Sequence, residues 1–285
     1  MEPIDIETWI EKSDTSVIEE FRRAVHVVLV AISRKPFLQS HMIIKGGILL
    51  AVKFRSTRHT KDIDFSSSEK LGDIDKVKIL EELKDGLIAA EDILPYGLVC
   101  KIQSHEVRPS RSDASFPTLK ITIGYAYKGT PKHRRLLNYN CPDVLRIDFS
   151  FNEYNYEIDD LEIPEVGTIR AYSLVDLVSE KYRAILQQEV RDRFRRQDAY
   201  DIYWILENGY LEEEDQKSEI LISLKIKAES RGLSVGRFSL RQEEIIRRSK
   251  IDYDTLAQEI QGKLPPFEEV YGNVKKYYES LPWDS

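Results

Sequence analysis

Lys45-Gly46-Gly47, and then Asp62-Ile63-Asp64-Phe65 after fourteen intervening residues, form the stretch that decides the fold of this chain. The segment 41–44 before the glycines predicts a short strand, and the apolar segment 48–52 after them predicts a helix. Glycines have no Cβ atom, so the backbone at this pair can approach an anion closely. The first N–H groups of the following helix would point at the same anion. We therefore expect a phosphate group to bind at Gly46 and Gly47.

Asp62 and Asp64 are two residues apart, so on a strand their carboxylates share one face. Ile63 and Phe65 then face the opposite way, toward a core. Two carboxylates on one rim offer the hard oxygen ligands that suit Mg²⁺ bridging substrate phosphates. Either half of the stretch has a simpler explanation, because a glycine pair often makes a turn and Asp-x-Asp often marks a solvated strand edge. The two halves in this order, with an apolar helix between them, favour a metal site.

Composition places the chain among ordinary globular proteins. It has 285 residues, 41% hydrophobic and 32% charged, which is enough for a sizeable core. The sequence lacks any apolar run near the roughly 20 residues that span a bilayer, and Met1–Asp5 lacks a signal-peptide pattern. Cys100 and Cys141 give neither a disulfide framework nor zinc-ligand spacing. We therefore expect a cytoplasmic protein with no membrane partner.

The net charge of −7 argues against a protein that coats nucleic acid, although it leaves room for a local basic patch. The segment Lys128–Arg135, which is expected to be a loop, is one candidate. Arg191, Arg193, Arg195 and Arg196 form the other. A solvated surface explains each of them equally well.

The N-terminal half alternates predicted helices with predicted strands. Helical spacing fills the first forty residues, with a capping box at Ser16 and Glu19 and an end at Pro36. A second helix is expected at 73–93. Apolar and polar residues then alternate around 98–102, 118–125 and 145–151, which predicts strands.

Asp148 falls on the polar face of the third of these strands, in mid-strand, where aspartate is disfavoured. It is therefore a candidate third acid beside Asp62 and Asp64, with a plain exposed face as the alternative. After Pro164 the pattern is helical. We predict an α+β protein in which residues 1–165 form a mixed-sheet domain and residues 166–285 form an all-helical C-terminal domain.

Three charged residues of the helical half are further candidates. Lys181 lies in mid-helix, and Asp198 and Asp201 share one face of the next helix. Asp198 also lies near the N-terminus of that helix, where a carboxylate complements the helix dipole. Solvation, the dipole and ion pairing with nearby arginines explain these residues at least as well as a catalytic role does.

Taken together, four segments resemble the motifs of the AbiEii toxin family, in the order that the family has them. The segments are Ile44–Leu50, Arg58–Phe65, Glu180–Ala184 and Arg196–Tyr203, and the closing Tyr277–Trp283 is also similar. The resemblance spans roughly residues 40 to 206 plus the tail. Its motifs are specific jointly and weak singly.

The resemblance implies a polymerase-beta-like nucleotidyltransferase core followed by the helical domain. Its relatives are toxins of toxin–antitoxin or abortive-infection systems. It further implies an NTP substrate, Mg²⁺ with Mn²⁺ as the alternative, and an RNA acceptor that we expect to be the 3′ end of tRNA. A cognate antitoxin is also implied, with direct contact left open.

Carried onto this sequence, the family's motifs imply a set of site residues. The nucleotide would be held by Lys45, Gly46, Gly47, Arg58, Thr60 and Lys181. The metal would be held by Asp62, Asp64 and Asp148, and these three would form the catalytic set with Lys181 and Asp198. Two departures stand out: Ile48 replaces the family's usual serine or threonine, and Gln188 replaces an arginine.

Two alternatives remain at this point. The same triphosphate site would serve AMP or phosphoryl transfer to a protein. A catalytically idle module that binds nucleotide or RNA would explain Ile48, which has no hydroxyl for a phosphate. The retained acidic set argues against the idle module, because gathering like charges without a function raises the free energy of the folded state.

Overall fold

The computed structural model describes residues 2–111, 113–211 and 213–284. The chain divides into two compact units. The first, here called the sheet unit, comprises Met1–Arg55, Thr60–Glu153 and Ile158–Ala171. The second, here called the helical unit, comprises Ser56–His59, Tyr154–Glu157 and Tyr172–Ser285.

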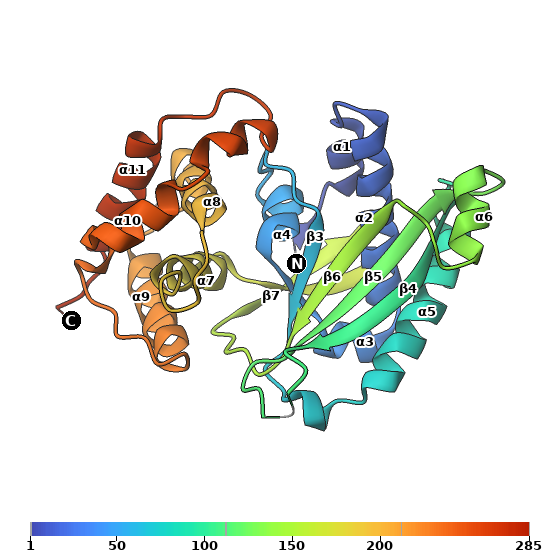
Figure 1. The fold of residues 1–285 in the computed structure, drawn as a ribbon, viewed down its shortest axis with the longest axis horizontal. Helices are drawn as coiled ribbons and strands as arrows, with labels where there is room; N and C mark the ends of the chain where they lie inside the picture. Colours follow the sequence, from blue (N-terminus) through green and yellow to red (C-terminus); the bar gives the residue numbers. More distant parts are fainter. Residues whose placement is uncertain (1, 112, 212, 285) are drawn as a thin grey trace. The chain divides into compact units, whose positions relative to one another are not determined.

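In the described part of the chain, the strands form one eight-stranded mixed sheet with the order β1-β7-β8-β2-β3-β6-β5-β4 (Figure 1). β2 pairs antiparallel with β3 and parallel with β8, and β3 pairs parallel with β6. β5 lies antiparallel between β6 and β4. The strands are β1 Glu2–Pro3, β2 Ile43–Lys45, β3 Asp62–Ser66, β4 Leu98–Arg108, β5 Thr118–Tyr127, β6 Val144–Ser150, β7 Ile158–Ile163 and β8 Gly167–Tyr172.

Helices of the sheet unit cover the apolar face of the sheet. The long helices α2 and α5 pack on each other and on β4 (Figure 1). Beneath them, Ile63, Phe65 and Ile147 have no exposed surface. The helices are α1 Ile6–Glu11, α2 Ser16–Ser33, α3 Pro36–His41, α4 Gly46–Lys53, α5 Lys76–Ile93 and α6 Pro131–Leu137, with a 3₁₀ turn at Leu71–Asp73.

The helical unit packs around α7, which contacts α8 and α9, and α11 packs on α8. Tyr182 and Tyr278 are fully buried, and the Tyr182 hydroxyl donates to the Val274 carbonyl at 3.0 Å. The elements are α7 Leu174–Leu186, α8 Arg196–Glu207, α9 Glu214–Glu229, α10 Glu243–Lys250 and α11 Phe267–Glu279, with 3₁₀ turns at Ser239–Arg241 and Tyr253–Gln258.

The short segment Tyr154–Glu157 belongs to the helical unit through polar contacts. Lys227 Nζ donates to the Tyr154 carbonyl at 2.6 Å, and the Tyr156 N–H donates to Asp176 Oδ2 at 3.1 Å. Lys227 Nζ also lies 3.1 Å from Asp176 Oδ1, and both side chains are buried. This segment is therefore fixed to α7 and α9 by its backbone.

The α+β class, with a mixed sheet and a helical C-terminal region, is confirmed, but four local predictions are wrong. Pro36 begins α3 instead of ending a helix, because proline suits the first helical position. The α2 cap is Thr15, whose hydroxyl accepts from the Ile18 N–H at 3.3 Å, and Ser16 is already helical.

The other two differences lie in segments that carry glycine or proline. The segment Lys128–Arg135 was expected to be a loop, but it contributes to α6, which Thr130 caps and which Pro131 begins. After Pro164 the chain forms β8 before any helix, with Ile169 and Ala171 buried. These elements are short and lie beside turn residues, so they contain too few residues to show a clear hydrophobic periodicity.

No helix of the described ranges is both long enough and apolar enough to cross a bilayer.

Candidate functional site

Gly46 joins β2 to α4 at the predicted phosphate cradle. Its φ of +72° lies in the left-handed region, and a Cβ atom there would lie 2.2 Å from Asp64 Oδ2. Only glycine meets both requirements. Lys45 occupies the N-cap of α4, and a lysine side chain has no acceptor with which to cap the first helical N–H groups. The cradle and the Asp64 carboxylate therefore lie in direct contact.

The parallel pairing of β3 with β6 gathers the predicted acids. Asp64 lies opposite Asp148, and Asp62 lies opposite Arg146. Directly paired residues point to the same face of a sheet, as do residues two apart on one strand. The three aspartates therefore share one face, and Ile63 and its neighbours line the buried face.

Asp62 is electrostatically poised for a cation. Its Oδ1 atom is buried and makes no hydrogen bond within the described residues. Burial, followed by the negative charge of Asp148, raises the pKa of Asp62 above its usual range. Arg146 and Lys120 oppose that shift. A buried carboxylate oxygen without a partner is costly unless something binds it.

The donor set fits Mg²⁺ better than a metal that needs a complete protein cage. Across the residues that the structure describes, no three His, Cys, Asp or Glu side chains are grouped so as to hold an ion. Mg²⁺ usually takes one or two carboxylates and completes its shell with water and substrate phosphates. Asp62 and Asp64 match that pattern. The metal role of Asp148 stays a prediction, and its Oδ2 accepts from Lys120 Nζ at 3.0 Å.

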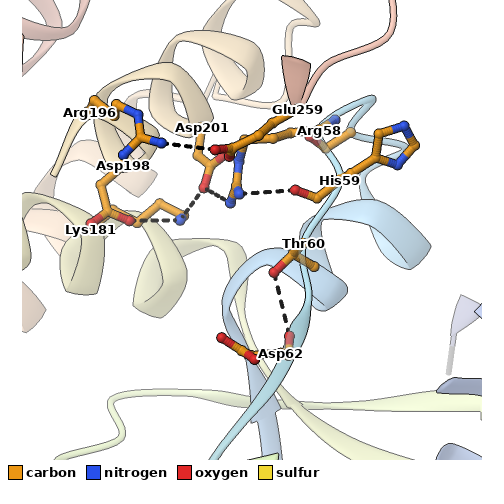
Figure 2. A network of polar contacts seen from close by, with 10 residues as sticks. Arg58, His59, Thr60, Asp62, Lys181, Arg196, Asp198, Asp201 and Glu259 are labelled. Carbon is orange, nitrogen blue, oxygen red and sulfur yellow. Dashed lines mark hydrogen bonds and ion pairs between the residues drawn. The ribbon is translucent and has the colours of Figure 1, made fainter. Parts of the chain in front are cut away.

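Two predicted nucleotide-binding side chains have local partners. The Thr60 hydroxyl donates to the Asp62 carbonyl at 3.5 Å, as Figure 2 shows. Lys45 Nζ lies 3.8 Å from Glu153 Oε1, and both side chains are only 11% exposed. Their contacts with a nucleotide stay predictions.

A buried ion cluster occupies the helical unit (Figure 2). Lys181 Nζ donates to Asp201 Oδ2 at 2.6 Å and to Asp198 Oδ1 at 3.1 Å. Arg58 donates two hydrogen bonds to Asp201, from Nε to Oδ1 at 2.7 Å and from Nη2 to Oδ2 at 2.8 Å. The Asp201 side chain has 0% exposure. Asp201 is therefore the centre of the cluster.

Opposite charges keep this cluster ionised despite its burial. Burial opposes ionisation of Asp201, but the charges of Arg58 and Lys181 outweigh it and lower the Asp201 pKa. Burial likewise opposes the charge of Lys181, and Asp201 and Asp198 raise its pKa. Arg58 and Lys181 are thus held by carboxylates, and their predicted contacts with nucleotide stay predictions.

Asp198 lies in the first turn of α8, and within the described chain only one of its two carboxylate oxygens accepts a hydrogen bond. Its Oδ2 makes no hydrogen bond to any residue that the structure describes, and it lies 3.6 Å from Arg195 Nη1. Arg196 nearby donates to Glu259 Oε1 at 2.8 Å. Asp201 was a candidate because it lies three residues after Asp198, but the site residues implied by the family resemblance include Asp198 and leave Asp201 out.

The sequence model of the family described as "Nucleotidyl transferase AbiEii toxin, Type IV TA system" matches residues 28–273. The structure is similar to MenT4, the nucleotidyltransferase toxin Rv2826c from Mycobacterium tuberculosis H37Rv, with a TM-score of 0.54, 12% identity, and 98% of this chain and 90% of that chain covered. JHP933 from Helicobacter pylori gives a TM-score of 0.49 at 12% identity, covering 94% and 93%. Among curated proteins, none matches.

The likeness to MenT4 concerns the fold, and it confirms that the α+β architecture is one that a nucleotidyltransferase toxin also has.

Proposed function

Because this chain belongs to the AbiEii nucleotidyl transferase toxin family of type IV toxin–antitoxin systems, we propose that it transfers a nucleoside monophosphate from an NTP to an RNA, in particular to the 3′ end of a tRNA. The family makes the chain a nucleotidyltransferase toxin. The observation that best supports the proposal is the contact of Gly46 with the Asp64 carboxylate, on the face that also carries Asp62.

The residues of the sheet unit would divide the reaction between them. Gly46, Gly47 and the N-terminus of α4 would hold the triphosphate, while Asp62 and Asp64 would hold Mg²⁺ or Mn²⁺, which would supply positive charge next to the phosphates. The acceptor hydroxyl oxygen bonds to the α-phosphorus, the bond from that phosphorus to the bridging oxygen breaks, and pyrophosphate leaves. Asp148 takes the hydroxyl proton on a carboxylate oxygen.

The departure at position 48 leaves this arrangement intact. Ile48 has no exposed surface and belongs to the core of the sheet unit. It supplies no hydroxyl, so the phosphate contact of this helix rests on backbone N–H groups. We expect this difference to alter nucleotide affinity.

The test incubates the protein with total tRNA, magnesium and each NTP in turn, labelled at either the α or the γ phosphate. Nucleotidyl transfer puts α label, and no γ label, on the RNA. Asp64→Ala should lower the rate by at least about 100-fold, since a group stabilising the transition state is lost. Asp85→Ala, an exposed change on α5, is the matched control. Full activity of a folded Asp64→Ala protein would refute the assignment.

The same assay identifies the chemical class of the acceptor. Label on a protein instead of RNA would show AMP or phosphoryl transfer to protein. As a toxin acting on NTP and RNA, the protein would work in the cytoplasm and be countered by a cognate antitoxin, whose co-expression should restore growth.

A further inference from the structure

A polar groove lies on the same face of the sheet as the aspartates. Strand pairing continues from Asp62 through Arg146 and Thr122 to Ser104. A second row runs from Asp64 through Asp148 and Lys120 to Glu106. The far parts of both rows line a partly open groove with a volume of about 450 Å³. Its polar lining includes Ser104, Glu106, Lys120, Thr122, Arg146 and Asp148.

The strand order puts this groove on a defined side of the acids. β2 ends at the glycine cradle, β3 carries Asp62 and Asp64, and β6, β5 and β4 carry the groove. The acids therefore lie between cradle and groove. In phosphoryl-type transfer, the attacking and leaving oxygens are roughly in line on opposite sides of the phosphorus. With the triphosphate on the cradle, an acceptor in the groove would lie on the opposite side of the acids, as in-line attack requires.

The lining fits an acceptor that carries a phosphate. Lys120 and Arg146 supply two cations, and Ser104 and Thr122 supply hydroxyl groups. The charge of Glu106 is offset by Arg108, whose Nη2 lies 2.7 Å from Glu106 Oε2. The volume lies within the ~300–1,000 Å³ range of small-ligand sites. A protein hydroxyl would bring no negative charge to these cations.

We propose that this groove holds the 3′-terminal nucleotide of the RNA acceptor, with its phosphodiester against Lys120 and Arg146 and its terminal hydroxyl at Asp148. The proposal rests on the proposed function. Lys120 contacts Asp148 at 3.0 Å, so a phosphate on Lys120 would bring the adjoining ribose next to the acid. Lys120 and Arg146 thus act as acceptor-positioning residues.

The test measures KM separately for total tRNA and for the NTP. Lys120→Met removes a charge-assisted contact and should raise the KM for tRNA by about 10-fold. Thr122→Trp fills the groove and should do the same, while the KM for the NTP stays within about 2-fold in both. Glu106→Gln should lower the KM for tRNA. Lys84→Met, an exposed change on α5, should alter neither value.

Binding of a fluorescein-labelled single-stranded oligoribonucleotide supplies a readout that does not need turnover. Lys120→Met and Thr122→Trp should weaken it, and thermal unfolding verifies that both variants fold. An unchanged KM for tRNA and unchanged oligoribonucleotide binding in these folded variants would overturn the groove assignment while leaving nucleotidyl transfer standing. Wild-type protein that labels no RNA would instead refute the proposed function, and label on a protein would replace the RNA acceptor.

Discussion

Asp62 is a half-buried carboxylate and Asp201 is a fully buried one, and their surroundings differ in kind. Among the described residues, none forms a hydrogen bond with Asp62 Oδ1, and the pKa of Asp62 is raised. Asp201 has both oxygens bonded to cations and a lowered pKa. The first pattern is typical of a site that awaits a ligand, and the second is typical of a structural ion pair.

Asp62→Asn should stabilise the protein while abolishing nucleotidyl transfer. Folding raises the pKa of Asp62, so its ionised form costs stability above the folded-state pKa. We expect a gain of about 0.5 kcal/mol at pH 7, kept small because solvent partly screens this half-buried group. The gain should shrink as pH falls through about 4 and vanish near about pH 3, where the carboxyl is protonated in the unfolded state as well as in the folded state. Denaturation of both proteins across that pH range checks this, and a variant less stable than wild type at pH 7 would contradict it.

Asp201→Asn should destabilise the protein. The substitution keeps the side-chain shape but leaves Arg58 and Lys181 without their shared counter-charge, which costs about 3 kcal/mol or more. Glu268→Gln is the matched control, because it removes an exposed ion pair with Lys250 at 2.5 Å and should change little. Thermal unfolding of both variants measures the loss of stability. Equal shifts in melting temperature would contradict a structural role for the buried cluster.

The proximity of residues was predictable from the sequence where they lie close along the chain, or where a strand carries an unusual side chain, as with Asp148 opposite Asp64. Gly46 lies close to Asp64 because β2, α4 and β3 follow one another in the chain and β3 returns antiparallel beside β2. The pairing of Arg58 with Asp201 joins residues 143 positions apart. No local pattern fixes such a pair, because it depends on where α8 packs.

Helices α2 and α5 cross where α5 carries Gly86. A Cβ atom on Gly86 would lie 2.7 Å from the Ala31 carbonyl oxygen of α2. Gly86→Ala should therefore destabilise by about 1–3 kcal/mol, although alanine is the better helix former. Gly272→Ala on α11 has open space and should instead stabilise by about 0.5–1 kcal/mol. Chemical denaturation measures both, and the same sign for the two changes would contradict close α2–α5 packing.

Element length explains which elements the sequence reveals. α2 and α5 have 18 residues each, so their apolar period is plain. α6 has seven residues and β8 has six. In α6, the capping residue Thr130 and the following Pro131 were better signals than hydrophobic period, because three basic side chains dominate the segment.

For the whole molecule, bound substrate should raise stability only together with a divalent ion. The triphosphate and the carboxylates of Asp62 and Asp64 are all negatively charged. The triphosphate is therefore repelled by the two carboxylates unless a cation lies between them. NTP with Mg²⁺ at 100 times the dissociation constant should add about 2.7 kcal/mol, and either one alone much less. A thermal shift series with EDTA measures this. A full shift with NTP and EDTA would contradict the metal site.

The fold class follows from the order of patterns along the chain, strands before helices. The change from strand patterns to helical patterns also predicts one boundary near residue 165. Contacts instead assign Ser56–His59 and Tyr154–Glu157 to the helical unit. Each segment is four residues long and has no pattern of its own, so only its tertiary partners reveal where it belongs.

That discontinuity limits how evolution and engineering can recombine the gene. A single crossover at codon 172 would exchange the helices but leave Arg58 and Tyr154 behind, on the parental side. Asp201 would then face whatever residue the other parent has at position 58, whereas Lys227 would still find a main-chain carbonyl at position 154. A working chimera between relatives therefore needs an arginine at position 58, which lies in the part of the gene before the crossover.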